Sequence, residues 1–209
     1  MKQILAFGDS NTWGLVPGSK PHKRYPWGKR WTSILQEKYE SSDVRIMEEG
    51  LCGRTTVFED ELRPGRKGLD TLSYLIESHY PLDAMVLMLG TNDCKSSYNA
   101  SPYTIGLGIE KCLDIAEKYV KSENIVLVSP ISLGDEVYKP EKDPEFDKQS
   151  IEKSGELKDV YRQIASKRGV RFLAASDYVE PSHVDDEHMD EKGHSIFADV
   201  IYDKLQEII

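Results

Sequence analysis

Short apolar runs alternate along the chain with longer segments in which apolar residues recur every three or four positions. The short runs are rich in β-branched residues and have the length of buried strands, whereas the longer spacing is typical of amphipathic helices. The predicted strands are Gln3–Phe7, Val44–Glu48, Ala84–Leu89, Ile125–Ser129 and Val170–Ala174. The predicted helical stripes lie within Trp31–Tyr39, Ile105–Val120, Leu157–Ile164 and Ile196–Ile208.

Strands that alternate with helices predict βαβ units, and therefore a parallel sheet with helices on both faces. We expect residues 1–209 to form one doubly wound α/β domain, because this length suffices for one well-buried core and is short for two. Two segments, Pro17–Gly28 and Gly134–Ser154, predict long loops after the first and fourth strands. Both loops would lie at the carboxyl ends of the strands, where open α/β sheets bind their ligands.

The chain is acidic, with a formal net charge of −9 from 27 basic and 36 acidic residues. Such a surface repels a polyanion, so no nucleic-acid partner is expected. No apolar run is long enough to cross a bilayer, and the first residues lack the apolar length and cleavage site of a signal peptide. We therefore expect a cytoplasmic protein without a membrane partner. Three widely spaced cysteines, Cys52, Cys94 and Cys112, predict packing thiols rather than disulfides or a metal clip.

The first strand runs directly into Gly8-Asp9-Ser10-Asn11-Thr12. A serine at the end of a strand, where a helix begins, is exposed to ligand, and its amide can point at an anion. Ser10 is therefore a candidate nucleophile, although an isolated Asp-Ser pair is more often a helix cap or a turn. The segment is not the G-x-S-x-G elbow of α/β-hydrolases, because position 12 is threonine.

Two further turns follow the second and third strands, at Gly50–Thr56 and at Gly90-Thr91-Asn92-Asp93. The glycines at 50 and 53 allow the backbone to approach a ligand closely. The side-chain amide of Asn92 is able to donate to a developing oxyanion, and Asp93 to brace the loop. Taken singly, each segment is more often a simple turn.

Near the carboxyl end, Asp185 and His188 are three residues apart, just before the last predicted helix. One turn would bring the carboxylate to the imidazole Nδ1–H, which leaves Nε2 free to take a proton from Ser10. The same acidic segment is also consistent with a solvated loop, or with a metal site that includes His183 and His194, although its spacing matches no known metal cage. Together, the strand ends supply a nucleophile, a base, a group that orients the base, and oxyanion donors, which are the parts needed for acyl transfer.

These blocks, in this order, resemble those of the SGNH/GDSL hydrolases across nearly the whole chain. The similarity is closest to the short-chain arylesterase/acyltransferase branch, through Gly8–Gly14, Arg30-Trp31, Glu48–Leu51, Arg54–Thr56 and Met88–Asp93. The resemblance implies a cofactor-independent, flavodoxin-like esterase with strand order 2-1-3-4-5 that acts on small esters and forms homo-oligomers. It implies that Ser10, Asp185 and His188 are the catalytic triad. It also implies that the oxyanion hole consists of the Ser10 and Gly53 amides and the Asn92 side chain.

Some features remain open at this point. Many members of the resembled family carry asparagine where this chain has Glu48, and His194 is expected to be a structural residue at a helix start. We expect Asp9, Trp13 and Asp93 near the substrate pocket, with Trp13 favouring small acyl groups such as acetyl, whereas Trp31 has the spacing of a core residue. Carbohydrate O-acetylesterase and lysophospholipase-like activities are alternatives. The alternative from another class is a non-catalytic flavodoxin-like module that binds a phosphate or nucleotide, although no P-loop or G-x-G-x-x-G follows the first strand.

Overall fold

The protein is built around a five-stranded, all-parallel sheet with the strand order β2-β1-β3-β4-β5. The computed structural model describes residues 1–39 and 43–209. The strands are β1 (Lys2–Gly8), β2 (Val44–Gly50), β3 (Ala84–Met88), β4 (Ile125–Ser129) and β5 (Arg171–Ala174). Each agrees with its predicted strand to within two residues, and both the parallel sheet and its strand order are confirmed.

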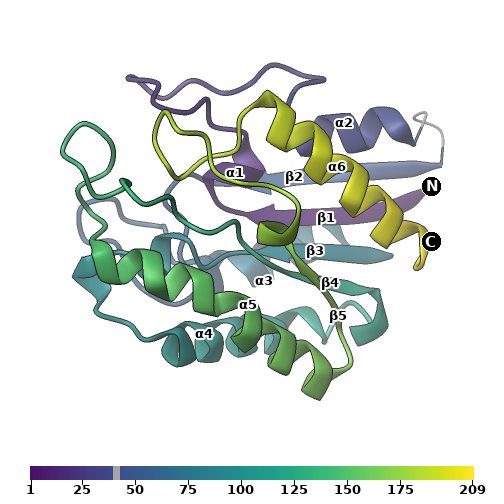
Figure 1. The fold of residues 1–209 in the computed structure, drawn as a ribbon. Helices are drawn as coiled ribbons and strands as arrows, with labels where there is room; N and C mark the ends of the chain where they lie inside the picture. Colours follow the sequence, from purple (N-terminus) through teal and green to yellow (C-terminus); the bar gives the residue numbers. More distant parts are fainter. Residues whose placement is uncertain (40–42) are drawn as a thin grey trace.

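Helices cover both faces of the sheet (Figure 1). On one face, α2 (Trp31–Lys38) packs against α6 (Glu191–Gln206). On the other face, α4 (Pro102–Ala116) lies between α3 (Gly68–His79) and α5 (Lys148–Arg168). The short helix α1 (Ser10–Trp13) directly follows β1. Single-turn 3-10 helices are η1 (Asn92–Cys94), η2 (Ser96–Tyr98), η3 (Ser122–Asn124) and η4 (Ala175–Asp177).

Each face of the sheet has its own apolar core, because successive side chains of a strand point to opposite faces. In β1, Leu5 and Phe7 belong to the core beneath α3, α4 and α5, whereas Ile4 and Ala6 belong to the core beneath α2 and α6. The second core includes Trp31, which is completely buried and meets Phe197 edge-to-face. β1 is therefore covered on both faces and lies between β2 and β3, so the residue that follows it is attached to rigid structure.

The structure differs from the sequence expectations in two places. Helix α3 was not predicted, because only Leu72 and Ile76 among its large side chains are completely buried and they form a short stripe. The segment 134–154 is not a loop throughout, since α5 begins at Lys148 with a capping box between Asp147 and Ser150. The first turns of α5 bury serines where an apolar residue would have marked a helix.

Within the residues that the structure describes, no helix is both long and apolar enough to span a membrane.

Candidate active site

Ser10 follows the carboxyl end of β1, as the first residue of α1. The carboxylate of Asp9 caps this helix by accepting from the Asn11 amide at 3.0 Å. Gly8 pairs with Gly50 of β2 on one side and with Met88 of β3 on the other. The backbone around Ser10 is therefore fixed by pairing with both neighbouring strands and by a helix cap. Ser10 itself is 3% exposed.

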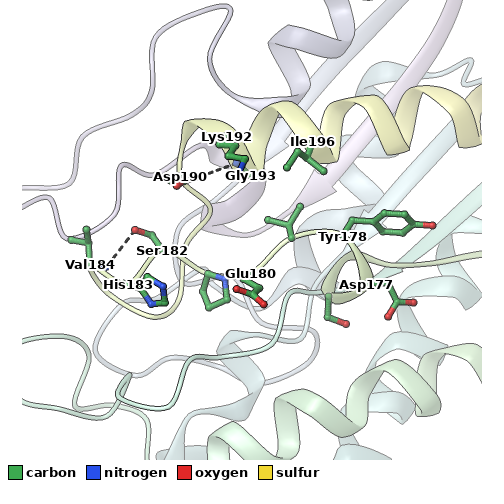
Figure 2. Close-up of a pocket in the computed structure, with 13 residues that line it drawn as sticks. Asp177, Tyr178, Glu180, Ser182, His183, Val184, Asp190, Lys192, Gly193 and Ile196 are labelled. Carbon is green, nitrogen blue, oxygen red and sulfur yellow. Dashed lines mark hydrogen bonds between the residues drawn. The ribbon is translucent and has the colours of Figure 1, made fainter.

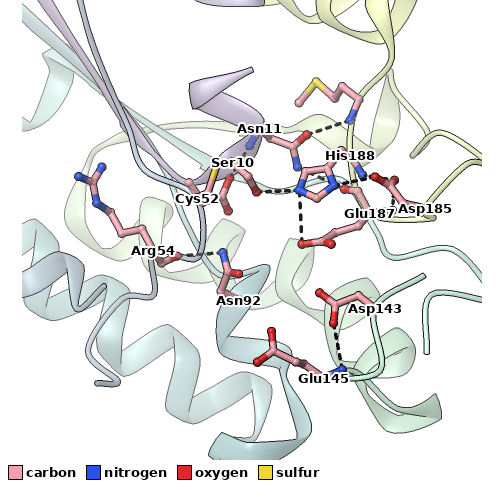
Figure 3. A network of polar contacts seen from close by, with 12 residues as sticks. Ser10, Asn11, Cys52, Arg54, Asn92, Asp143, Glu145, Asp185, Glu187 and His188 are labelled. Carbon is pink, nitrogen blue, oxygen red and sulfur yellow. Dashed lines mark hydrogen bonds and ion pairs between the residues drawn. The ribbon is translucent and has the colours of Figure 1, made fainter. Parts of the chain in front are cut away.

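The structure brings Ser10, His188 and Asp185 into one chain of hydrogen bonds (Figure 3). The Ser10 Oγ lies 2.8 Å from His188 Nε2, and His188 Nδ1 lies 2.9 Å from Asp185 Oδ2. The serine is 178 positions away from the histidine in the sequence. With Nδ1 donating to the carboxylate, Nε2 is left as an acceptor for the serine hydroxyl, which is the tautomer that a general base requires.

Asp185 is held in place by more than the histidine. Its Oδ1 accepts from the amides of Glu187 at 3.1 Å and His188 at 3.0 Å, and its Oδ2 also accepts from the Gly18 amide at 2.9 Å. The last contact comes from the loop after the first strand, so residues 17–28 help to support the triad. Both carboxylate oxygens are thereby saturated by donors, which fixes the position of the negative charge.

The charge environment of the histidine favours its protonated form. Burial by itself would lower the pKa of His188, but the carboxylates of Glu187 and Asp185 outweigh burial and raise this pKa above its ordinary value. Burial would likewise raise the pKa of Asp185, yet the hydrogen bond and positive charge of His188 lower it below its ordinary range. The site is therefore arranged to stabilise an imidazolium next to an ionised carboxylate.

The residues expected to bind an oxyanion line the same cavity as Ser10 and His188. Gly53 has a φ of +83°, in the left-handed region that favours glycine, so the turn strains any other residue. Asn92 donates from Nδ2 to the Arg54 carbonyl at 3.1 Å, which orients its amide. Within residues 1–39 and 43–209, the amides of Ser10 and Gly53 donate to no protein acceptor. Three donors are thus gathered beside the serine.

The cavity is small and polar. Its volume is about 130 Å³, below the usual range of drug-sized ligand pockets. Apart from Leu15, Cys52 and Gly53, its walls carry charged or hydrogen-bonding side chains: Ser10, His22, Arg63, Asn92, Lys95, Asp143, Glu145, Glu187 and His188. The Cys52 thiol is not a rival nucleophile, because burial raises its pKa to about 11 and keeps it protonated.

Asp9, Trp13 and Asp93 do not line this cavity, in contrast to our expectation for the pocket. Asp93 is completely buried and accepts from the amide and hydroxyl of Thr56, so it braces the second turn from below. The Asp9 side chain points back toward α1, where it caps the helix through the Asn11 amide. The Trp13 ring lies outside the cavity, against the Arg24 guanidinium, whose Cζ is 5.5 Å from the ring centroid. Buried carboxylates and a stacked indole support the site without facing a ligand.

Several residues of the site were not found from the sequence. Asn11 holds the histidine segment on both sides, because its Nδ2 donates to the Glu187 carbonyl at 3.3 Å and its Oδ1 accepts from the Met189 amide at 2.9 Å. Only its place next to Ser10 could have signalled this role. Glu187, which lies between Asp185 and His188 in the sequence, faces the cavity, and no role was predicted for its side chain.

A further support comes from Asp186, which adopts a left-handed conformation with a φ of 59°. Its Oδ2 accepts from the Glu136 amide at 2.9 Å and from Lys142 Nζ at 2.8 Å. The loop between β4 and α5, which carries Asp143 into the cavity, is therefore fastened to the catalytic turn.

Glu48 and His194 have structural partners. Arg30 and Thr32 hydrogen-bond to the Glu48 carboxylate, and although burial raises the pKa of Glu48, these bonds hold it below its ordinary value. His194 lies completely buried in the first turn of α6, where its Nδ1 accepts from the Trp31 amide at 3.3 Å. Burial lowers the pKa of His194 to about 4, so this ring is neutral and is not a second base.

A larger hollow of about 590 Å³ lies on the surface between the 176–184 segment and the start of α6 (Figure 2). It contains His183 and Asp190 but no triad residue, and Asp190 is engaged in capping α6 through the Gly193 amide. His183 and His194 do not come together with the acidic cluster, and no group of metal-ligating side chains occurs in the described parts of the chain. The chemistry is concentrated in the smaller cavity.

A comparison with known families agrees with this geometry. Residues 6–196 match the GDSL-like lipase/acylhydrolase family, so the chain belongs to this family and is a carboxylic ester hydrolase of the SGNH type. No curated protein sequence matches the chain. The resemblance drawn from the sequence blocks is therefore confirmed at the level of family and enzyme class.

Solved structures refine the comparison. The chain is similar to the aryl esterase of M. smegmatis, at 29% identity over all of both chains and a TM-score of 0.91. It is similar to a carbohydrate acetylesterase from Sinorhizobium meliloti, at 32% identity over all of both chains and a TM-score of 0.88. A putative arylesterase from Agrobacterium tumefaciens matches at 30% identity, again over all of both chains, with a TM-score of 0.88.

Proposed function

We propose that this protein hydrolyses short acyl esters, acetyl esters foremost, through an acyl-enzyme on Ser10. The observation that carries the proposal is the chain of hydrogen bonds from Asp185 through His188 to Ser10, beside a cavity that three oxyanion donors share. The flavodoxin-like binding module considered above has no comparable support, because a nucleotide-binding loop would have no need of this relay.

The geometry supports a two-step reaction. His188 Nε2 takes the Ser10 proton while Oγ attacks the ester carbonyl, and the imidazolium is stabilised by Asp185. The amides of Ser10 and Gly53 and the Asn92 side chain receive the oxyanion. His188 then protonates the leaving alcohol, and water activated by the same nitrogen hydrolyses the acyl-enzyme. An alcohol in place of water would give acyl transfer, and product analysis with added alcohol distinguishes the two outcomes.

Two features favour small and hydrophilic substrates. A cavity of about 130 Å³ leaves room for a short acyl group but not for the long chain of a lysophospholipid. The charged lining, with Arg63, Lys95 and Asp143 among its side chains, favours a polar alcohol over an aromatic one. For this reason a carbohydrate O-acetylesterase is the second candidate function, in line with the similarity to the Sinorhizobium enzyme.

A panel of esters on wild type and Ser10→Ala tests the proposal. We expect 4-nitrophenyl acetate to be hydrolysed faster than the butyrate and octanoate esters, and acetylated sugars to be substrates. Ser10→Ala is expected to lower kcat on every ester by a factor on the order of 10⁶, and to abolish labelling by a fluorophosphonate. Equal turnover by both proteins would contradict the assignment of Ser10. The homo-oligomer implied by the family resemblance stays a prediction, which sedimentation of the purified protein would test.

A further inference from the structure

The carboxyl group of Glu187 stands out among the buried groups of the site. Its residue is only 6% exposed, yet within the described residues its carboxylate makes no hydrogen bond to the protein. Among the described residues it has one polar contact, an ion pair with His188: Oε1 lies 3.5 Å from Nε2, beyond normal hydrogen-bond distance. The backbone of Glu187 is fully engaged, since its amide donates to Asp185 and its carbonyl accepts from Asn11.

The ion pair at 3.5 Å leaves the acceptor positions of this carboxylate without a hydrogen bond from the described residues, so a ligand in the space that it faces is able to donate to it. That space is the catalytic cavity, which Glu187 lines together with Ser10 and His188. Figure 3 shows the Glu187 carboxylate beside the imidazole, on the side that faces the Asp143 carboxylate across the cavity. Burial raises the pKa of Glu187, although the positive charges of His188 and Lys95 act in the opposite direction.

The distance to Nε2 determines what part of a substrate Glu187 would meet. Nε2 must pass its proton to the leaving alcohol, whose oxygen then lies at about 2.6–3.2 Å from that nitrogen. Because Oε1 of Glu187 lies 3.5 Å from the same nitrogen, it is within reach of groups one or two bonds from the leaving oxygen. The acyl group lies on the other side of the scissile bond, toward the oxyanion donors.

We propose that Glu187 is a specificity-determining residue whose carboxyl group accepts a hydrogen bond from a hydroxyl group next to the ester oxygen in the alcohol part of the substrate. The preferred leaving group is then a polyhydroxylated alcohol with vicinal oxygens, as in a sugar. The inference rests on the proposed esterase function and goes beyond it, since it assigns the choice of alcohol to one side chain. Asp143, which lines the same cavity, forms no ion pair with His188 in the described chain and is not given this role.

Two acetate esters that differ in a single hydroxyl group test the inference. Cyclohexyl acetate and trans-2-hydroxycyclohexyl acetate share the acyl group and ring, and acetate release gives kcat/KM for each. We expect wild type to prefer the hydroxylated ester by about 10- to 100-fold, the factor that a hydrogen bond to a charged group provides. In Glu187→Val the preference should fall to near unity, whereas Glu187→Gln, which keeps an acceptor oxygen, should retain part of it.

The measured quantity is the ratio of the two kcat/KM values, so any common effect of Glu187 on His188 cancels. Glu180→Val is a matched control, because this acid lies in the neighbouring larger hollow and not in the cavity, and its ratio should equal that of wild type. An unchanged ratio in Glu187→Val, or a ratio that Asp143→Asn abolishes instead, overturns the inference. If the valine variant fails to fold, the glutamine variant decides, since an undiminished preference there overturns the inference equally. Loss of activity on both esters in Ser10→Ala tests the esterase function separately.

Discussion

Replacement of Asp185 by asparagine is the sharpest test of the proposed relay, because it alters one atom and leaves the shape of the side chain unchanged. The Oδ2 atom accepts from both His188 Nδ1 and the Gly18 amide, and Oδ1 accepts from two further backbone amides. An NH₂ group in the place of Oδ1 would face two backbone donors. An NH₂ group in the place of Oδ2 would face the Gly18 amide, which loses its acceptor, and His188 Nδ1. The NH₂ group is able to donate to Nδ1 if the imidazole proton moves from Nδ1 to Nε2. The second orientation is therefore favoured.

In that orientation Nδ1 accepts from the amide, and Nε2 carries a proton that prevents it from accepting the proton of Ser10. Glu187 reinforces this tautomer, because its carboxylate lies 3.5 Å from Nε2 and attracts the N–H. A triad with the wrong tautomer loses about 10⁴-fold in kcat, which corresponds to about 5.5 kcal/mol of transition-state stabilisation. Because Gly18 is exposed, water replaces the acceptor that its amide loses, so the free energy of unfolding should change little.

The assay is steady-state hydrolysis of 4-nitrophenyl acetate, with ¹⁵N shifts of the imidazole to report which nitrogen is protonated. Asp190→Asn is the matched control, since asparagine caps a helix as well as aspartate and the bond to the Gly193 amide is kept. We expect this control to retain full kcat. If Asp185→Asn keeps more than a tenth of the wild-type kcat, the tautomer argument is refuted.

Three further predictions concern the surroundings of the triad. His188 must be neutral to act as a base, and its pKa is raised, so kcat/KM should increase with pH through a midpoint above about 6.5. Glu187→Gln removes a negative charge that raises this pKa, so it should move the midpoint to lower pH. An unmoved midpoint would contradict the charge coupling between Glu187 and His188. Burial lowers the pKa of His194 to about 4, so the unfolded chain takes up this proton first as pH falls, and stability is lost between pH 6.5 and pH 4. Relative to His194→Gln, wild type should lose about 2 kcal/mol in urea unfolding between about pH 7 and pH 5, and equal losses would show that His194 is not buried as described. Asn11→Ala removes the hydrogen bonds that hold the backbone on both sides of His188. It should lower kcat for 4-nitrophenyl acetate by about 10²-fold with little change in KM. A wild-type kcat in this variant would show that Asn11 does not position the base.

The sequence was most informative where burial of a whole segment leaves a clear apolar pattern. β3 and β4 are buried along their whole length and read as continuous apolar runs, so their positions were predicted to within one residue. The sequence pattern missed the start of α5 for the opposite reason. Ser150 and Ser154 occupy buried positions of that helix, and they hydrogen-bond to the Cys94 carbonyl and the Leu133 amide, so polar residues stand where the pattern requires apolar ones.

The candidate site divides in a similar way. Ser10, Gly53, Asn92, Asp185 and His188 follow the carboxyl ends of strands or precede a helix, so sequence order alone gathers them at one edge of a parallel sheet. The direction of each side chain does not follow from that order. Asp93 and Asp9 turned inward to brace the backbone, and Trp13 turned outward under Arg24, although all three adjoin the motifs.

The sequence by itself determined the α/β class, the family of ester hydrolases and the identity of the residues that could perform acyl transfer, because these depend on local periodicity and on short motifs. Only the tertiary structure decided that the imidazole of His188 lies 2.8 Å from the hydroxyl of Ser10, that Asn11 holds it there, and that Glu187 faces the cavity beside that imidazole. The reason is that distances between residues far apart in the chain depend on how the sheet and its loops pack, and the environment of a charge depends on every group that packing brings near it.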